Sequence, residues 1–367
     1  MTLKNTFGNN ISVTIFGESH GSAIGAVIDG LAPGIEVDEE TIAAYLSRRR
    51  PSMATDTPRQ EKDPFQIVSG VFNGRTCGTP VAIVIPNGDT RSKDYDYGPA
   101  RPSHADFAAY EKYHGFEDYR GGGHFSGRIT AALVAVGGIL LPALASKGIH
   151  IGTHISSCGG AKDRGFENMQ EDIVALQTKM FPVLDDSAAE EISAEIIAAG
   201  NDNDSIGGVT ETAITGMPAG VGEPWFDSIE SMMSHAIFSI GAIKGIEFGE
   251  GFTMAGSRGS QVNDAFRINE GRVTTLTNNN GGINGGLTNG MPVTFRCAVK
   301  PTPTIARTQQ TVNFITGENI DMTARGRHDP AIIRRVCPVI DSVAAIVICD
   351  VLAGRYGTDY LGPEARH

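Results

Sequence analysis

The stretch Ala26-Val-Ile-Asp-Gly-Leu-Ala-Pro-Gly-Ile35 returns 186 residues later as Thr212-Ala-Ile-Thr-Gly-Met-Pro-Ala-Gly-Val221. A second pair follows in the same order, where Gly70-Val-Phe-Asn-Gly-Arg-Thr-Cys-Gly-Thr-Pro-Val81 matches Gly282-Ile-Asn-Gly-Gly-Leu-Thr-Asn-Gly-Met-Pro-Val293. A weaker third match pairs residues 121–128 with 325–330. Ordered matches of this kind indicate internal duplication. We therefore expect one domain over 1–367, with similar halves at about 1–150 and 200–367 and a helical connector at 151–199.

The order of elements within each half predicts the class of fold. Strand-like runs at 11–16 and 26–28 come first, and a helix at 41–50 follows the acidic residues 38–40. Two further strands, at 67–72 and 81–85, form a hairpin around Asn73-Gly74. A buried helix begins at about Ile129. Strands that arrive in hairpins argue against repeated βαβ units and favour antiparallel sheets layered against central helices.

Composition excludes several classes of function. The chain of 367 residues has a net charge of −12, which argues against binding to nucleic acid or to an anionic membrane. Of its 30 basic residues 21 are arginine, whose planar fork pairs with carboxylate and phosphate groups. Compositional bias is the alternative explanation. Glycine occurs 46 times, where average usage gives about 26.

Cysteines and apolar runs bear on compartment. Five scattered cysteines without a CxxC pair predict a reducing compartment and no metal site. Residues 1–10 carry no apolar signal region, so we expect a cytoplasmic protein. The apolar run 129–146 contains Gly137, Gly138 and Pro142, and we interpret it as a buried core helix and not as a membrane span.

Two segments place a histidine where its ring is a candidate for acid–base catalysis. In Gly17-Glu-Ser-His20-Gly21, the ring stands among small residues at the end of an apolar strand, where it could act as an acid or base. In Arg101-Pro-Ser-His104-Ala-Asp106, a second histidine precedes a helix-like run. The alternatives are a turn histidine satisfied by backbone and a helix-capping motif with Ser103 as N-cap.

Arginine- and glycine-rich segments are candidate anion sites. Arg48-Arg49-Arg50-Pro51, with Arg59 nearby, lies at a helix end, although consecutive side chains point in different directions and also suit a helix C-terminus. Residues 119–128 place three glycines before the apolar helix, as an anion cradle of backbone N–H groups requires. Residues 278–286 and 300–304 each also suit an ordinary turn.

A last segment, Arg325-Gly-Arg-His-Asp329-Pro330, combines arginine, histidine and aspartate before the final apolar helix. Asp329 beside arginine should be ionised and could act as a base in a sheltered site. The alternative is that Asp329 is the N-cap and Pro330 the first residue of that helix.

Taken together, GESHG, RPSHAD, RGGG before SGR, and GRHDP resemble the chorismate synthase family, over nearly the whole chain from Phe7 to Leu352. The resemblance implies a β-α-β sandwich in a homotetramer. It implies an anti-1,4-elimination of phosphate from 5-enolpyruvylshikimate-3-phosphate, with reduced FMN required. NADPH or an external flavin reductase would supply the reduced flavin.

The resemblance also implies roles for individual residues. His20 would protonate the reduced flavin, His104 the leaving phosphate, and Asp329 would assist deprotonation at flavin N5. Substrate or NADP contacts would be Arg49, Arg50, Arg59 and Arg128, and no metal is expected. FMN contacts would be His124, Phe125, Ser126, Gly241, Ala242, Gly285, Lys300, Pro301, Thr302, Pro303, Thr304 and Arg327.

The chain departs from the family pattern at a few of these positions. His124 stands where the family often has arginine, and Pro303-Thr304 where it often has two serines. Two other classes remain as alternatives: a nucleotide-dependent kinase or reductase, and a non-catalytic flavin-binding protein. The missing P-loop lysine opposes the first, and the retained His20, His104 and Asp329 oppose the second.

Overall fold

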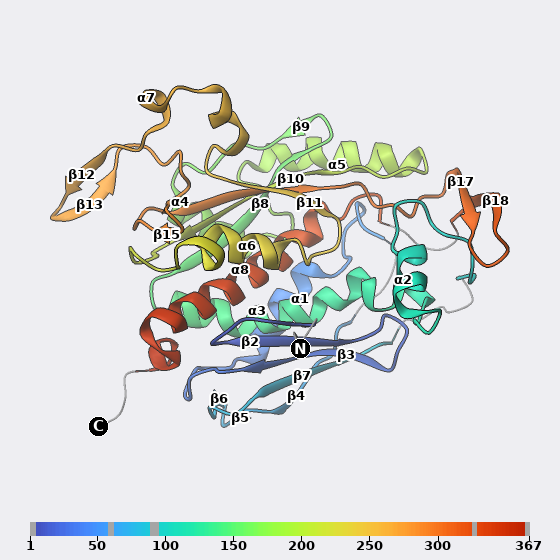
Figure 1. Cartoon of the computed structure of the whole chain (residues 1–367), viewed down its shortest axis with the longest axis horizontal. Coiled ribbons are helices and arrows are strands. Elements are labelled where there is room, and N and C mark those ends of the chain that lie inside the picture. Colours follow the sequence, from blue (N-terminus) through green and yellow to red (C-terminus); the bar gives the residue numbers. More distant parts are fainter. Residues whose placement is uncertain (1–4, 58–61, 89–94, 325–328, 364–367) are drawn as a thin grey trace.

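Two five-stranded antiparallel sheets enclose a layer of long helices, and two shorter helices cover the outer face of one sheet (Figure 1). The structure is a computed structural model that describes residues 5–57, 62–88, 95–324 and 329–363. The predicted class, antiparallel sheets around central helices, is confirmed.

Each sheet is built from hairpins. The first has the order β1 (Thr6–Phe7), β2 (Ser12–Gly17), β3 (Ala23–Asp29), β7 (Val81–Pro86), β4 (Gln66–Ser69). The second has the order β11 (Ile243–Phe248), β16 (Val293–Val299), β10 (Gly208–Thr215), β8 (His150–Cys158), β9 (Ala161–Lys162). Four two-stranded ribbons lie outside them: β5 (Val71–Phe72) with β6 (Arg75–Thr76), β12 (Phe266–Asn269) with β13 (Arg272–Thr275), β14 (Ile283–Asn284) with β15 (Leu287–Thr288), and β17 (Thr308–Asn313) with β18 (Glu318–Thr323).

The two sheets share strand order and register. Ile28 of β3 lies opposite Val81 of β7, and Ile214 of β10 lies opposite Val293 of β16. These pairs are related by the two offsets found in the sequence. The same holds for one buried threonine in the β5–β6 ribbon and one in the β14–β15 ribbon. Thr76 Oγ1 accepts a bond from a backbone N–H at 2.9 Å and donates to a turn carbonyl at 2.6 Å, and the equivalent Thr288 bonds measure 3.0 and 2.6 Å.

The boundary of the second half differs from the expectation. Residues 150–158, which we assigned to a helical connector, form β8, and its Ile151 lies opposite Ile214 just as Val13 of β2 lies opposite Ile28. The second half therefore begins near residue 150, and α4 (Met169–Leu176) and α5 (Asp186–Asn201) are inserted between β9 and β10. The strand escaped notice because polar residues, His154 among them, interrupt its apolar pattern.

The central layer consists of α1 (Glu39–Arg49), α3 (Thr130–Ala145) and α8 (Ile333–Tyr356). Asp38 caps α1 by accepting bonds from the backbone N–H groups of Glu40 and Thr41, as its acidic start predicted. Two helical segments, 127–145 and 333–356, are apolar and long enough to span a membrane. They are 72% and 94% buried between the sheets, so packing in the core accounts for their apolar character.

Helix α3 approaches its neighbours closely at two glycines. A Cβ atom at Gly137 would lie 2.1 Å from Ser342 Oγ and 3.0 Å from Ser342 Cα of α8. One at Gly138 would lie 2.8 Å from Ile42 Cα of α1. These contacts leave no room for a side chain, so the glycine pair sets the spacing of the central helices.

The remaining helices lie at the periphery. They are α2 (Asp106–Tyr113), α6 (Ile229–Ile237) and the short α7 (Gly259–Val262), with 3-10 turns η2 (Arg120–Phe125), η3 (Gly127–Ile129), η4 (Trp225–Asp227), η5 (Gly251–Gly256) and η6 (Thr358–Leu361). In Figure 1 the β12–β13 ribbon and α7 project from the body as an arm.

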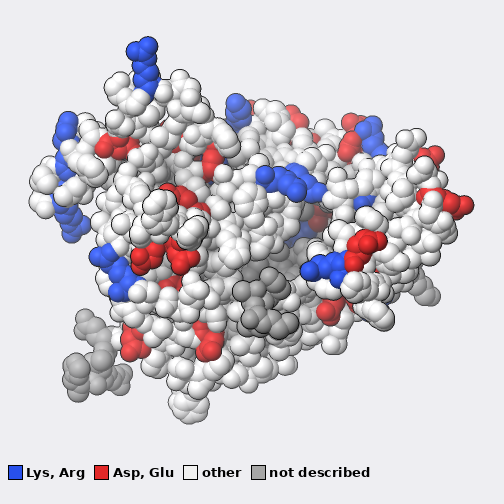
Figure 2. Space-filling model, viewed as in Figure 1, with Lys and Arg blue, Asp and Glu red and all other residues white. Residues whose placement is uncertain are grey.

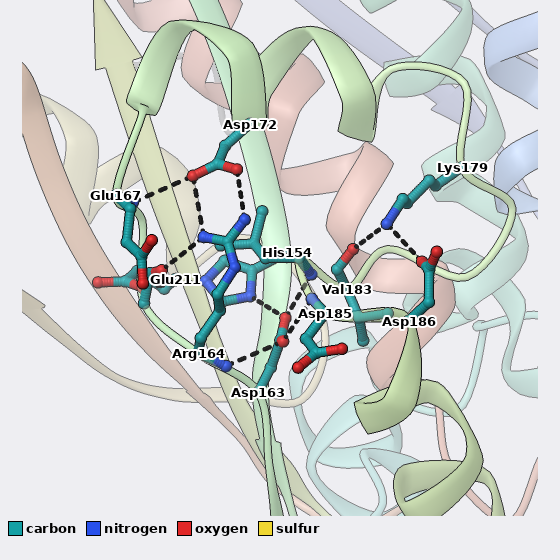
Figure 3. Close-up of polar contacts among 12 residues, drawn as sticks. His154, Asp163, Arg164, Glu167, Asp172, Lys179, Val183, Asp185, Asp186 and Glu211 are labelled. Carbon is teal, nitrogen blue, oxygen red and sulfur yellow. Dashed lines mark hydrogen bonds and ion pairs between the residues drawn. The ribbon is translucent and has the colours of Figure 1, made fainter.

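An ion-pair network fastens the outer helices to the second sheet (Figure 3). His154 of β8 is fully buried, and its Nδ1 and Nε2 lie 2.8 and 2.9 Å from carboxylate oxygens of Asp163 and Glu211. Burial opposes charge on the ring, but the two carboxylates outweigh it and raise the pKa of His154 above its usual 6.5. Asp163 also accepts backbone bonds from Leu184 and Asp185, so the network spans β8, β10 and the loop before α5.

Replacing Gly137 by alanine should destabilise the fold by about 1–3 kcal/mol, because overpacking outweighs the higher helix propensity of alanine. The matched control is Gly200→Ala in α5, where the new Cβ meets Pro330 at an ordinary 3.4 Å. That variant should be neutral or up to about 1 kcal/mol more stable. Urea unfolding of both measures the difference, and equal effects would disprove the packing argument.

His154→Gln should lower the free energy of unfolding by about 3–5 kcal/mol near pH 6, because the buried carboxylate of Asp163 and the half-buried one of Glu211 lose their charged partner. The contribution of a group with a raised pKa is present below pH 6.5 and is lost as pH rises through the folded-state value. The gap between wild type and variant should therefore shrink towards pH 9. Arg164→Gln removes a more exposed ion pair to Asp172 and should cost about 1 kcal/mol or less.

Candidate active site

A cavity of about 760 Å³ opens between the central helices, the end of the first sheet and the loops that follow α6 and β16. Its floor is apolar and comes from α3 and α8: Leu133, Val336, Val339, Val343 and Ile346. A second hollow of about 790 Å³ adjoins it and shares Tyr95, Arg101, His104, His124 and Phe125. The two hollows are thus neighbours, but among the described residues the second is lined by one arginine and six carboxylates.

The charge of the cavity wall is opposite to that of the protein. Six cationic side chains line it, namely Arg49, Arg101, Arg128, Lys244, Lys300 and Arg335, against one described carboxylate, Asp329. Figure 2 shows Lys and Arg side chains bordering a hollow on one face, with Asp and Glu side chains both beside the hollow and elsewhere on that face. Burial, and then the nearby charge of Lys244, lowers the pKa of the Lys300 ammonium. Such a wall suits a ligand with several negative charges.

The three arginines that end α1 point in three directions. Arg48 is buried in the core, 3.5 Å from Asp341 of α8. Burial raises the pKa of Asp341 to about 6, although Arg48 opposes the shift. Arg49 lines the cavity, whereas Arg50 turns away and donates to the carbonyl of Lys62 at 2.7 Å. The structure therefore brings one of the three to the cavity.

A buried carboxylate joins two predicted substrate contacts. Asp63, whose side chain is fully buried, accepts a hydrogen bond from Arg49 Nη2 at 3.1 Å and forms a short ion pair with Arg128. Arg128 also donates to Asn87 Oδ1 at 3.1 Å. Asp63 thus compensates part of the charge of both guanidinium groups and holds them at one wall of the cavity.

The start of α8 holds Asp329. Arg335 donates to Asp329 Oδ2 at 2.5 Å and to the carbonyl of Arg49 at 2.9 Å, and Thr57 N–H donates to Asp329 Oδ1 at 2.9 Å. The N-cap of α8 is Ile332 and not Asp329, so the capping interpretation is wrong. The carboxylate is instead held at the cavity wall by two donors.

The neighbouring Arg334 fixes the loop that supplies Thr57. Its guanidinium is buried and donates to Asp56 Oδ1 at 3.0 Å and Oδ2 at 2.5 Å. It also donates to the carbonyls of Arg48 and Arg50. This arginine therefore ties the segment after α1 to the first turn of α8.

His104 stands at the start of α2 with a carboxylate behind it. Its Nδ1 lies 2.7 Å from Asp106 Oδ1, and Arg101 grips the same carboxylate with bonds of 2.8 and 2.7 Å. The predicted N-cap, Ser103, is wrong, because α2 has Ala105 as N-cap and Ser103 adopts a left-handed φ of 58°. The Ser103 carbonyl accepts a bond from Lys300 Nζ at 2.8 Å.

The three glycines before α3 make room for histidine rings. A Cβ at Gly121 would lie 2.1 Å from the His20 ring, and one at Gly122 would lie 3.3 Å from the His104 ring. Both glycines have positive φ. His20 is half-buried against Tyr95, with ring centroids 5.3 Å apart, and Tyr95 in turn lines the cavity. His20 itself is not among the residues lining either hollow.

The same loop uses four of its N–H groups internally. The N–H groups of Gly122, Ser126 and Ile129 donate to carbonyls within the loop, and that of Arg128 donates to Ser126 Oγ. His124 Nδ1 donates to the Gly17 carbonyl at 2.7 Å. The cavity is therefore met here by side chains, with Phe125 45% exposed.

Two loops distant in sequence meet at the far wall. Lys300 N–H donates to the carbonyl of Ala242 at 2.9 Å, and Ala242 has a φ of 74°, rare for a residue with a side chain. The Thr302 carbonyl accepts a hydrogen bond from Ser205 Oγ at 2.7 Å. Its own hydroxyl is buried with no hydrogen-bond partner among the described residues.

Most of the predicted site residues therefore share one cavity. Those that line it are His104, Asp329, His124, Phe125, Ser126, Gly241, Ala242, Lys300, Thr302, Pro303, Thr304, Arg49 and Arg128. Gly285, at the exposed tip of the β14–β15 ribbon, Pro301 and Arg50 do not. Arg59 and Arg327 lie outside the described residues.

Sequence reasoning missed the partners of these residues. Asp63, Asp106 and Arg335 each contact a predicted site residue, but only Asp106 stands close to its partner in sequence. The signal for Asp106 was its spacing of two residues from His104. No local signal marks Asp63 or Arg335.

An apolar-floored cavity with a cationic wall, with His104 and Asp329 among its lining residues, is typical of an enzyme that acts on a small anionic molecule. Its family follows from comparison with known proteins. A sequence model of the chorismate synthase family matches residues 11–353. The chain belongs to the chorismate synthase family, a family of lyases of the shikimate pathway.

Individual relatives agree over almost the whole chain. It is 43% identical to the chorismate synthase of Methanocella arvoryzae over 351 residues, covering 94% of this chain and 93% of the relative. It is 44% identical to that of Agathobacter rectalis over 355 residues, covering 96% and 95%. A crystal structure of a chorismate synthase superposes with a TM-score of 0.75 at 29% identity, covering 95% of this chain and 94% of the other.

Proposed function

We propose that this chain converts 5-enolpyruvylshikimate-3-phosphate to chorismate by anti-1,4-elimination of phosphate, with reduced FMN as the cofactor. The observation that carries the proposal is the set of six cations around one cavity in a chain of net charge −12. The substrate brings two carboxylates and a phosphate, and FMN brings another phosphate. Arginine forks pair with both kinds of group.

The residues present fit FMN. The apolar floor formed by α3 and α8 matches a planar ring system, and the Lys300 loop offers groups for a phosphate. The buried Thr302 hydroxyl lacks a partner, which a phosphate oxygen would supply. Lys300 and Lys244 repel each other and would be stabilised by an anion between them. His124, Phe125, Ser126, Gly241 and Ala242 would complete the contacts.

The chain itself would bind the substrate and move protons. When bound, reduced FMN supplies electron density that assists phosphate departure and accepts the hydrogen. Arg49 and Arg128, set by Asp63, would hold the anionic groups of the substrate. His104 would donate a proton to an oxygen of the leaving phosphate, and Asp329, held by Arg335, would accept one. His20, which packs against Tyr95 of the cavity wall, would protonate the reduced flavin.

Supply of the reduced cofactor belongs to the same proposal. NADPH bound near Arg49, Arg50 or Arg59, or a separate flavin reductase, would provide it. We also propose a cytoplasmic location, in keeping with five described cysteines that form no disulfide.

An anaerobic assay of phosphate release tests the function. Wild type should release phosphate with photoreduced FMN and none with oxidised FMN. Asp329→Asn should lower kcat by about 10²–10⁴-fold, as loss of an acid–base group does. Asp359→Asn, remote from the cavity, is the control and should keep full activity. Folded wild type that releases no phosphate would refute the proposal, and NADPH in place of the photoreductant tests intrinsic flavin reduction.

We further propose that the chain forms a homotetramer through its arm. The β12–β13 ribbon exposes Phe266, Ile268 and Val273 by 59–72%, and Trp225 and Phe226 of η4 are 85% and 92% exposed. Large apolar side chains gathered on a projecting element are typical of an interface. A second copy of the chain is the partner we assign to this surface.

Sedimentation velocity tests the assembly. Wild type should sediment as a tetramer, and Phe266→Ser with Ile268→Ser should shift it to smaller species, because apolar contact area is lost. A control double change at two exposed polar positions, Thr308→Ser and Glu318→Gln, should leave the size unchanged. A monomeric wild type would contradict the proposal.

A further inference from the structure

We propose that Asp106 is the residue that positions His104, by holding its ring protonated at Nδ1 so that Nε2 is the nitrogen that carries the transferred proton. The inference rests on the proposed function only for the acid role of His104. It assigns to Asp106 a task that neither the sequence nor the family resemblance gave it.

The distances decide which ring nitrogen bears the proton. Nδ1 of His104 lies 2.7 Å from Asp106 Oδ1 and 3.2 Å from Arg101 Nη2. Two lone pairs would face each other at 2.7 Å if Nδ1 were unprotonated. A proton on Nδ1 avoids this repulsion and is shared with Asp106, whereas the longer hydrogen bond between Arg101 Nη2 and Nδ1 requires the other tautomer. The tautomer of a histidine is set in this way by the bond its other nitrogen makes.

Asp106 is itself fixed in position and charge. Arg101 donates to Asp106 Oδ2 through Nε at 2.8 Å and to Oδ1 through Nη2 at 2.7 Å, and the Arg101 backbone N–H adds a bond of 2.9 Å. Burial opposes ionisation, but the bonds from Arg101 and His104 outweigh it and hold the pKa of Asp106 well below its usual range. The carboxylate also begins α2, where the helix dipole favours negative charge.

The other edge of the His104 ring is the one left for substrate. This edge faces the backbone of Gly122, where an added Cβ would meet Nε2 at an ordinary 3.4 Å, and His104 lines both hollows. The charged or titratable groups around the ring are Arg101 and Asp106 from its own segment, Tyr95 and His124 from the shared cavity wall, and Lys300, whose Nζ is bonded to Ser103. Asp106 is the one carboxylate that the structure shows in contact with the ring.

The expected consequence concerns turnover more than binding. With Nδ1 bonded to a carboxylate, the imidazolium that donates from Nε2 is stabilised and correctly turned. Without the carboxylate, the neutral ring can protonate at Nε2 and present the wrong atom. General acid catalysis contributes about 10²–10⁴-fold to the rate, so loss of Asp106 should lower kcat within that range.

The test combines ¹⁵N NMR with kinetics on the full chain. The nine histidines make a ¹⁵N-histidine spectrum tractable, and loss of one signal in His104→Gln identifies the ring. At pH 9, the neutral His104 ring of wild type should be protonated at Nδ1. In Asp106→Asn, the Nε2-protonated form should rise at least about tenfold and kcat should fall by about 10²-fold or more, with KM changed less than about threefold.

Two further variants separate positioning from folding. Asp172→Asn breaks an equivalent two-bond pair with Arg164 outside the cavity and should leave tautomer and kcat at wild-type values. Asp106→Glu keeps the carboxylate and should retain the Nδ1 form. If Asp106→Asn does not fold, the tautomer of His104 in wild type and in Asp106→Glu still tests whether the carboxylate sets the ring.

Each remaining outcome overturns the inference. An Nε2-protonated ring in wild type, or an unchanged tautomer in Asp106→Asn, would show that Asp106 does not set the ring. A changed tautomer with unchanged kcat, or a loss confined to KM, would show that Asp106 acts on the fold or through Arg101. The NMR result needs no cofactor or substrate, so it stands even if wild type releases no phosphate.

Discussion

The close approach of α3 to α1 and α8 is the constraint on which the site depends. Gly137 and Gly138 allow backbone to meet Ser342 and Ile42 with no side chain between them. Because the spacing is fixed in mid-helix, the C-terminal end of α1 and the first turn of α8 come to lie side by side. Arginines from both ends then face the same space between the sheets.

The buried arginines need negative partners, and the structure pairs each of them with a carboxylate. Asp63 serves Arg49 and Arg128, Asp56 serves Arg334, and Asp329 serves Arg335. A buried charge without a partner would cost several kcal/mol. The same pairs orient the guanidinium groups before any ligand arrives, which lowers the ordering cost of binding.

Glycine contributes to the site because it has no side chain. At Gly121 and Gly122 the backbone turns with positive φ and the missing Cβ atoms leave space for the rings of His20 and His104. The sequence suggested a cradle of N–H groups at this loop. Four of those N–H groups are used within the loop itself, and two of the glycines also leave room for the histidine rings.

Much of the fold could be predicted from local pattern and repetition. The hairpins, the capped α1 and the buried helices follow from periodicity, turn residues and the two matched stretches, whose offsets reappear as strand register. The strand β8 could not, because polar residues such as His154 break its apolar pattern and are satisfied only by Asp163 and Glu211 from other segments.

The sequence by itself determined which chemical groups this protein has and where its chain turns. Short motifs placed His104 beside Asp106 and Asp329 before the last helix, since neighbours in sequence are neighbours in space. Only the tertiary structure decided that Arg335 and Thr57 hold Asp329, that Asp63 joins Arg49 to Arg128, and that His20 stands behind Tyr95. These contacts link residues far apart in the chain, and their geometry follows from how closely the central helices pack.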